Sequence, residues 1–566
     1  MTIVRPTMKR GARKLGYALR ALAIDFGNRD LGLLGVARIA TSFANWSFAI
    51  ALGVYGFEAH GAVGVGLVAL VRFLPGAIAS PFAGLLIDRY PRRTVLLASS
   101  LAMGTVLAGA TVAASLGAPA GVVFVFPALF AVASCGYGPA ESALIPSLAR
   151  TPQELSASNV THSAMENSGF LLAAVVTGFL LGATSPGFVF GVATAASAIA
   201  TTVVAAVERD RRPDYADAEG DVVGVVREIG LGLRTLVEHP ALRLSAATLI
   251  VLLLFEGFAD VLVVVMALEL LHLEESSVGF LNASWGLGAL LGGAGLALLL
   301  DRGKLVIAIA GGSLVLGLAT MLPGIWPGPV SGYLGWLGIG IGFTFVEVAA
   351  KTLMQRLGSD ETLGRVIGSL ESARLAAMAL GSIGAIGLLE LLGTRGALIA
   401  LGALMPVFVI VCWARLRAFE VGAPVAEGPY LLLRENSIFA PLPIATLERL
   451  SHDLVPVGAG AGEDVIVQGE KGARFFLIEH GQVEVFENGT FRRNEGPGES
   501  FGEIALLHDV PRTATVRATV QTRLLALERE QFLVAVTGHR RSRQVAHTVV
   551  DNRWDGQGVG DVTALD

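Results

Sequence analysis

A series of long apolar runs fills the first 420 residues of this chain and constrains its fold more than any other feature. A run of about 18 or more apolar residues is long enough to cross a bilayer as a helix, and inside lipid the backbone must satisfy its own hydrogen bonds. The sequence therefore predicts a multi-pass, all-α membrane domain embedded in the lipid bilayer. Twelve helices are expected, at about 32–56, 62–86, 93–115, 119–143, 159–183, 187–207, 243–268, 277–300, 305–325, 329–350, 365–389 and 395–414.

Composition excludes several classes of protein. The chain is 53% hydrophobic and only 16% charged, whereas a soluble domain is near 25% charged. Its formal net charge of −5 argues against a nucleic-acid partner, which needs a basic face. Cys135 and Cys412 both fall in apolar runs, so neither a disulfide framework nor a metal site is expected. The sequence contains no nucleophile elbow or P-loop, and we expect no enzyme, no catalytic residue and no prosthetic group.

Lysine and arginine predict the orientation, because basic loops stay in the cytoplasm. They gather in the segment 1–30, in the loop at 89–93, in the linker 208–242 and in later loops on the same side. Arg395 is the one basic residue that we find on the opposite side. Both termini are therefore expected in the cytoplasm, with the protein in the cell (inner or plasma) membrane.

The membrane domain repeats internally, with halves at 31–207 and 243–418. The segment GLLIDR at 84–89 corresponds to ALLLDR at 297–302, and a glutamate precedes an arginine by nine residues at Glu141–Arg150 and Glu347–Arg356. Two six-helix halves joined by a polar linker are typical of secondary transporters. Gly288 and Gly292 form a small-residue pair in the eighth predicted helix, which fits either close packing within the bundle or a homodimer.

The loop after the second predicted helix reads Gly84-x-x-x-Asp88-Arg89-x-x-Arg92-Arg93. It resembles the cytoplasmic signature of the major facilitator superfamily. The resemblance covers about 25–418 and is strongest to the branch of single-component exporters. It implies a loop that locks the two halves together while the transporter faces outward. Pro91 stands where the family prefers glycine, and a weaker second copy follows at Asp301-Arg302. The expected gating residues are Gly84, Asp88, Arg89, Arg92, Arg93, Asp301 and Arg302.

Ionisable residues inside the predicted helices are the candidates for coupling, since burying a charge in a bilayer is expensive. Glu256 and Asp260 lie four residues apart in the seventh helix and share a face. Two carboxylates so close do not readily ionise together, so we expect one to hold a proton. Positions Glu166 and Arg374 are roughly equivalent in the repeat and are expected to face each other across a cavity. The candidates for proton coupling or substrate binding are Glu256, Asp260, Arg38, Arg72, Glu166 and Arg374. The alternative is a purely structural role: Arg38 and Glu371 lie near cytoplasmic helix ends and can extend to the interface, and Glu347 and Lys351 can simply pair.

The composition changes after a linker at 419–434. Short β-rich segments at 465–467, 474–478 and 482–486 alternate with glycine, asparagine and proline turns. We expect a small soluble domain at 435–538, followed by a tail at 539–566.

The segment FGEIALLHDVPRTATVRA at 501–518 has the parts of a phosphate-binding cassette. Gly502 permits close backbone approach, and Ile504 and Ala505 can begin a short helix whose N–H groups bind a phosphate. Arg512 can add charge-assisted hydrogen bonds. Glu503 can accept a hydrogen bond from a ribose hydroxyl.

These residues resemble the cyclic-nucleotide-binding domain family over about 435–538. The resemblance implies a β jelly roll with flanking helices that binds cAMP or cGMP as a regulatory ligand, and a lid for which 540–550 is the candidate. Thr513 leaves cGMP possible beside cAMP. The expected binding residues are Phe501, Gly502, Glu503, Ile504, Ala505, Arg512, Thr513 and Ala514.

Together the two parts predict a secondary active transporter, a proton-coupled exporter of an unknown small molecule, that a cytoplasmic cyclic nucleotide regulates. Three alternatives stay open. The membrane part can be a receptor or scaffold without transport, or the cargo can be a lipid, or the cargo can be the cyclic nucleotide itself.

Overall fold

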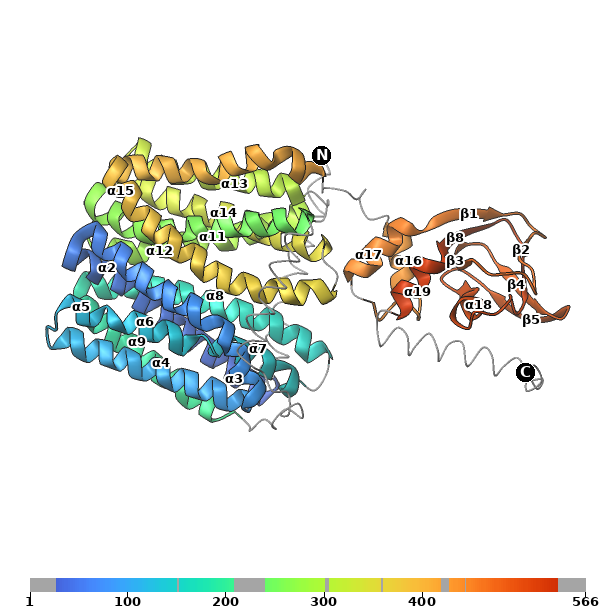
Figure 1. The fold of residues 1–566 in the computed structure, drawn as a ribbon, viewed down its shortest axis with the longest axis horizontal. Coiled ribbons are helices and arrows are strands. Elements are labelled where there is room, and N and C mark those ends of the chain that lie inside the picture. Colours follow the sequence, from blue (N-terminus) through green and yellow to red (C-terminus); the bar gives the residue numbers. More distant parts are fainter. Residues whose placement is uncertain are drawn as a thin grey trace, which may run out of the picture. The chain divides into compact units, whose positions relative to one another are not determined.

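The computed structural model describes residues 27–149, 152–207, 240–300, 305–357, 360–418, 427–442 and 444–537. It divides into two compact units, 1–420 and 421–566. The first is helical and the second contains all the described strands, so each is treated separately below (Figure 1).

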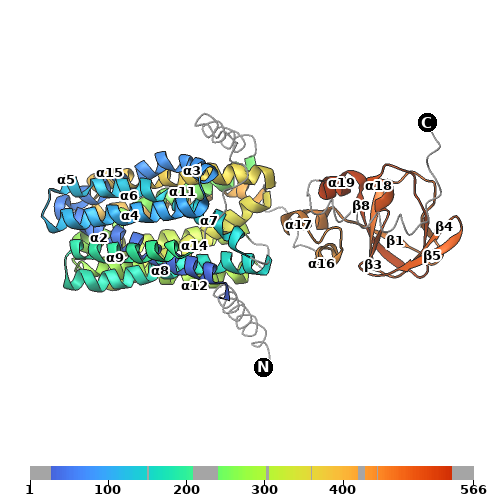
Figure 2. The same cartoon turned by 90° about the horizontal axis from the view of Figure 1, so that it is seen from below.

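The helical unit consists of two bundles, which lie one above the other in Figure 1 and overlap in the view of Figure 2. The bundles contact each other where α2 packs against α11 and α15, and where α8 packs against α12. The first bundle contains α2 (Arg29–Ala79), η1 (Ser80–Phe82), α3 (Ala83–Arg89), α4 (Arg92–Ser115), α5 (Ala120–Val123), α6 (Val125–Ser134), α7 (Tyr137–Leu148), α8 (Pro152–Ala183) and α9 (Pro186–Ala205). The second contains α11 (Pro240–Val265), the π-helix η2 (Met266–Leu270), α12 (Ser276–Leu300), α13 (Leu305–Ile325), α14 (Pro329–Leu357) and α15 (Asp360–Ala418).

Two of these helices are longer than one membrane crossing needs. The 51-residue α2 is interrupted at His60 and Gly61, where φ of Gly61 is +60°, and the 59-residue α15 is interrupted at Gly393, with φ of +64°. By length and composition, nine helices among the described residues can span a membrane. Dividing the two long ones at their interruptions and adding the 25-residue α12 gives twelve helical segments in the described chain. This matches the number of apolar runs.

The fourth predicted helix, at 119–143, differs in detail because the structure divides that region into α5, α6 and α7. Proline explains where the new helices begin. Pro127 and Pro139 are each the third residue of a helix, α6 and α7 respectively. A proline in the first turn removes no helical hydrogen bond, whereas the same residue in the interior of one continuous helix would.

The small-residue pair in α12 is used inside the bundle. A side chain at Gly288 would collide with the backbone of Leu337, and one at Gly292 with Ile341, both in α14. The pair therefore lets α12 and α14 approach closely, which is the intramolecular packing that small residues permit.

The second unit contains two four-stranded antiparallel sheets and short helices. The strand orders are β1-β8-β3-β6 and β2-β7-β4-β5. The strands are β1 (Val455–Ala459), β2 (Asp464–Ile466), β3 (Arg474–His480), β4 (Val483–Glu487), β5 (Thr490–Glu495), β6 (Ser500–Phe501), β7 (Thr515–Ala518) and β8 (Thr522–Glu528). The helices are α16 (Glu427–Glu435), α17 (Ile444–Asp453), α18 (Glu503–Leu507) and α19 (Arg529–Thr537).

The central strands β3 and β8 are buried on both faces, so successive side chains enter two different cores. Phe476 and Ile478 pack in the core that joins the two sheets. Phe475 and Leu477 pack in a second core with residues of the helices. There the ring of Phe475 stacks on Phe532 of α19, with centroids 4.8 Å apart. This double burial fixes β6 and the segment that follows it, where the candidate ligand-binding residues lie.

Candidate functional site

Arg512 is the central residue of the cassette in the second unit. Its side chain is buried, and its Nη1 atom donates to the carbonyl oxygen of Gly502 at 2.9 Å. Its Nη2 atom donates to the carbonyl oxygen of Arg474 in β3 at 2.6 Å. The backbone around it is also fixed, because its N–H donates to Glu470 O and its carbonyl accepts from Gly469 N, both at 2.8 Å. The guanidinium is therefore held at the junction of β3, β6 and α18.

Two glycines make room for this guanidinium. A Cβ on Gly472 would lie 2.8 Å from Arg512 Cζ, and one on Gly502 would lie 2.7 Å from Arg512 Nη1. Gly502 also has φ of +93°, a conformation that other residues adopt only under strain. Gly502 therefore lets Arg512 approach the backbone closely, while the predicted approach of a phosphate stays a prediction.

The short helix expected after Gly502 is present as α18. Glu503, Ile504, Ala505 and Leu506 in it are all buried. Phe501 stacks on Phe476 with centroids 5.3 Å apart, which anchors the strand that leads into the helix. Further along, Ala514 is buried and Thr513 is half-buried. The eight predicted binding residues thus lie in one strand–helix–loop segment, and Arg512 returns to its beginning.

The electrostatics of the segment centre on the same arginine. Burial lowers the pKa of the Arg512 guanidinium, while the nearby Glu503 and Glu470 act in the opposite direction. Arginine nevertheless stays protonated in proteins. A buried cation that is held by backbone carbonyls beside a helix start is an arrangement that can bind an anionic oxygen. The lid candidate at 540–550 lies outside the described residues.

In the helical unit, the predicted gating loop joins α3 to α4. Arg93 donates to the carbonyl oxygens of Val207 at 2.8 Å and Ala205 at 2.6 Å. It therefore holds the C-terminal end of α9, where a cation is favourable, within its own half. Gly84 and Arg89 are exposed and Arg92 is half-buried. The side chain of Asp88 and the residues Asp301 and Arg302 lie outside the described part.

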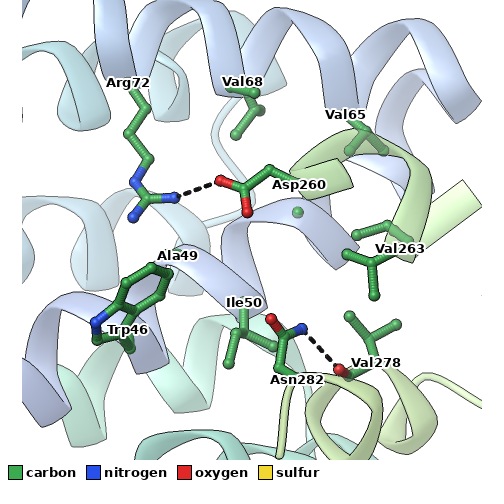
Figure 3. Close-up of a pocket in the computed structure, with 13 residues that line it drawn as sticks. Trp46, Ala49, Ile50, Val65, Val68, Arg72, Asp260, Val263, Val278 and Asn282 are labelled. Carbon is green, nitrogen blue, oxygen red and sulfur yellow. Dashed lines mark hydrogen bonds and ion pairs between the residues drawn. The ribbon is translucent and has the colours of Figure 1, made fainter. Parts of the chain in front are cut away.

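The ionisable residues of the first and second bundles meet at a pocket between α2, α11 and α12. Arg72 Nη1 lies 3.5 Å from Asp260 Oδ2, and its guanidinium lies 5.4 Å from the ring centre of Trp46. Figure 3 shows Arg72 pointing toward Asp260, with Trp46 beside the pair. The remaining lining is mostly apolar, from Ala49, Ile50, Gly53, Val65, Val68, Ala69, Val263, Val264 and Val278, with Asn282 as a further polar group.

The Nδ2 atom of Asn282 donates to the carbonyl oxygen of Val278 at 2.9 Å (Figure 3). Glu256 lies one turn before Asp260 on α11, as the spacing predicts, and is half-buried. Each member of an ion pair in a mostly apolar pocket can bind a ligand or a proton in place of its partner. Coupling between proton binding and ligand binding requires such an exchange.

The expected meeting of Glu166 and Arg374 is not what the contacts give. Glu166 Oε2 lies 2.6 Å from Arg38 Nη2, while Arg374 Nη1 lies 3.6 Å from Met378 Sδ on its own helix. Arg38 also contacts Glu141 at 2.9 Å, and Glu141 in turn lies 3.2 Å from His162 Nδ1. The sequence analysis noted Glu141 only as a repeat marker and did not single out His162. Both are polar residues at the ends of apolar runs, and this was the feature of the sequence that could have identified them.

Comparisons with known proteins assign both units. The Major Facilitator Superfamily model matches residues 34–382, which is more than half of the chain. The cyclic nucleotide-binding domain model matches residues 458–538.

One of the curated relatives matches a short part of this chain. The cAMP-dependent protein kinase regulatory subunit of Yarrowia lipolytica (strain CLIB 122 / E 150) is 35% identical over 126 residues, which are 22% of this chain and 34% of that protein. The chain thus spans about a third of that relative's length.

Two solved structures resemble the first unit. A POT family transporter in complex with 5-aminolevulinic acid has a TM-score of 0.57 at 15% identity, covering 69% of this chain and 97% of that one. A POT family transporter in complex with a thioalcohol-conjugated peptide has a TM-score of 0.55 at 15% identity, covering 69% and 96%. At this identity the similarity shows a shared fold.

Proposed function

Since the chain belongs to the Major Facilitator Superfamily and carries a C-terminal cyclic nucleotide-binding domain, we propose that it is a secondary active transporter regulated by cAMP or cGMP. In this proposal it exports a small molecule from the cell in exchange for protons, by alternating access. The cyclic nucleotide binds the cytoplasmic C-terminal domain and biases the transport cycle.

The position of Arg512 supports the proposed regulation by a cyclic nucleotide. The guanidinium is buried where β3, β6 and α18 meet, and it donates to two backbone carbonyls there. A cyclic phosphate would offer this cation a full negative charge in place of partial ones, and charge-assisted hydrogen bonds are stronger than neutral ones. Nucleotide binding would thus change the partners of Arg512 and, through them, the contacts of Gly502 and Arg474.

The Arg72–Asp260 pair supports the proposed coupling of transport to protons. It joins α2 of the first bundle to α11 of the second, across the pocket lined by both. A proton and a cationic group of a substrate would compete for Asp260, since each takes the place of Arg72 at the carboxylate, and an exchange of substrate for protons requires such competition. Because a buried unpaired charge is costly, binding of the proton and binding of the substrate affect each other. Glu256 is a neighbouring carboxylate that can share the proton.

Calorimetry tests the regulatory part. Full-length protein in detergent is titrated with cAMP and with cGMP. We expect one of them to bind, and Arg512→Ala to weaken binding by about 10-fold or more, since hydrogen bonds to charged groups contribute roughly 1.5–3 kcal/mol. Arg517→Ala is the matched control, because Arg517 is an exposed arginine of the same domain that pairs with Asp464.

Absence of binding to the folded wild-type protein, or equal binding by Arg512→Ala, would contradict the sensor. Uptake of labelled cAMP into vesicles that contain the protein would instead make the nucleotide a cargo.

A further inference from the structure

A second cluster of ionisable residues lies entirely within the first bundle and takes no part in the pocket around Asp260. It consists of Arg38 on α2, Glu141 on α7, and His162 and Glu166 on α8. The contacts form a continuous series: His162 to Glu141 at 3.2 Å, Glu141 to Arg38 at 2.9 Å, and Arg38 to Glu166 at 2.6 Å. Three helices are thus joined through charges in the interior of one half.

The ring of His162 is held in one orientation. Its Nδ1 atom faces Glu141 Oε1, and Glu141 is itself buried, with 5% of its side chain exposed. A carboxylate accepts hydrogen bonds and donates none. The proton of the neutral imidazole therefore belongs on Nδ1, where it is donated to Glu141. This leaves a lone pair on Nε2.

The Nε2 atom is buried and has no hydrogen-bond partner among the residues that the structure describes. His162 as a whole is only 7% exposed. A buried acceptor without a partner is unfavourable, and an imidazole nitrogen with a free lone pair is a good base. The lone pair of Nε2 is thus not used by another residue that the structure describes and can accept a proton, which would turn an unpartnered acceptor into an unpartnered donor.

The charges of the neighbours favour the imidazolium that would result. Arg38 contributes one positive charge, while Glu141 and Glu166 contribute one negative charge each, so the cluster has an excess negative charge while His162 is neutral. A proton on His162 balances it. Among the residues that the structure describes, Tyr137 on α7 is a further titratable group that faces the cluster, and its hydroxyl accepts a hydrogen bond from Thr41 Oγ1 at 3.1 Å.

One member of the cluster is exposed. The side chain of Glu166 is 50% exposed, against 20% for Arg38 and 5% for Glu141. Ser42 fixes the backbone beside it by donating to Glu166 O at 2.8 Å. A change of charge on Glu166 would alter its ion pair with Arg38. A change in the position of Arg38 would in turn alter the electrostatic field at Glu141 and His162. The buried histidine is therefore electrostatically linked to an exposed carboxylate.

From this geometry we infer that His162 and Glu141 form a second proton-binding site of the transporter, with His162 Nε2 as the proton acceptor and Glu141 as its positioning residue. The inference rests on the proposed proton-coupled transport for its role, and on the cluster alone for its existence. It gives the first bundle a proton site that shares no residue with the Arg72–Asp260 pair.

Solid-state NMR of the full-length protein in lipid bilayers, with ¹⁵N-labelled histidine, tests the inference without a transport assay. The His162→Asn variant identifies the His162 resonances by their loss. We expect the His162 ring to take up a proton as the pH is lowered from about 8 to about 5.5. In Glu141→Gln the ratio of charged to neutral ring at pH 7 should fall about 10-fold or more, because an opposite charge at this distance is removed.

The chain offers a matched control in Glu347→Gln. Glu347 holds the corresponding position of the second half in the sequence repeat and pairs with Lys351 at 2.6 Å, so this variant should leave His162 unchanged. Glu166→Gln keeps the test usable if Glu141→Gln does not fold. Because Glu166 is half exposed, its substitution should fold and lower the charged fraction by a smaller factor.

A His162 ring that stays neutral between pH 5.5 and 8, or one that keeps its charge ratio in both carboxylate variants, would overturn the inference and leave the contact as a structural clamp. If His162 titrates as expected but vesicle experiments find no proton movement with transport, the proposed function fails while the proton site stands.

Discussion

Arg72 shows how the charge of a single residue is accommodated inside the membrane domain. Its guanidinium is shared between Asp260 at 3.5 Å and the rings of Trp46 and Phe73, whose centres lie 5.4 and 5.0 Å away. Aromatic faces attract a cation more weakly than a carboxylate does. Removal of Asp260 would therefore leave Arg72 with inadequate compensation in an apolar pocket.

This predicts strong coupling between the two residues in a double-mutant cycle. Asp260→Asn and Arg72→Gln should each lower the melting temperature in detergent, because each leaves one buried charge unpaired. The double variant should be more stable than the two single losses added together predict. Additive losses, measured by thermal unfolding of the purified proteins, would show that the two charges do not interact.

Part of this site was predictable from the sequence. The spacing of Glu256 and Asp260 places both on one face of a helix, and the structure agrees. Spacing along one helix contains no information about the partner on another helix, however. Arg72 as the partner of Asp260, Arg38 as the partner of Glu166, and the contact between Glu141 and His162 all depend on how separate helices pack.

Helix contacts between the two halves depend on small residues. At the crossing of α8 and α12, a side chain on Gly279 would collide with the backbone of Gly178 and Ala174. Gly293 lies on the same helix α12 with nothing within 4 Å of the position a Cβ would take. The two glycines thus differ in packing while sharing the same helical backbone.

Gly279→Val should therefore destabilise the protein and separate α8 from α12, and Gly293→Val should have little effect. Overpacking at a close contact costs about 1–3 kcal/mol, while the intrinsic helix preference changes equally in both variants. Thermal unfolding in detergent measures the difference. Equal melting temperatures for the two valine variants would show that the α8–α12 contact does not contribute to stability.

Elements were predictable where their signal is local. Apolar length located the membrane helices, and the loops expected near 57–61 and 390–394 coincide with the interruptions at Gly61 and Gly393. The strand expected at 474–478 is β3 at Arg474–His480. Apolar length alone does not show where a helix restarts, which is why 119–143 was expected as one helix although α6 and α7 begin anew around their prolines.

The whole molecule combines a transporter fold with a cyclic nucleotide-binding domain, and the boundary between its two compact units falls outside the described residues. Regulation requires that nucleotide binding at one unit changes the conformational equilibrium of the other. Allosteric coupling of this kind is typically about 1–3 kcal/mol, or roughly 5–150-fold in an equilibrium constant. Such a change is large enough to redistribute a transporter between its two faces.

The most direct test of this claim is a distance measurement between the two bundles by pulsed electron spin resonance. Spin labels are placed at Leu116→Cys, which follows α4, and at Leu391→Cys in α15, because both leucines are highly exposed, at 80% and 83%. The native Cys135 and Cys412 are replaced by alanine. We expect the nucleotide that binds in calorimetry to shift the distance distribution, and we expect Arg512→Ala to abolish the shift. An unchanged distribution at saturating nucleotide, with binding intact, would contradict this claim.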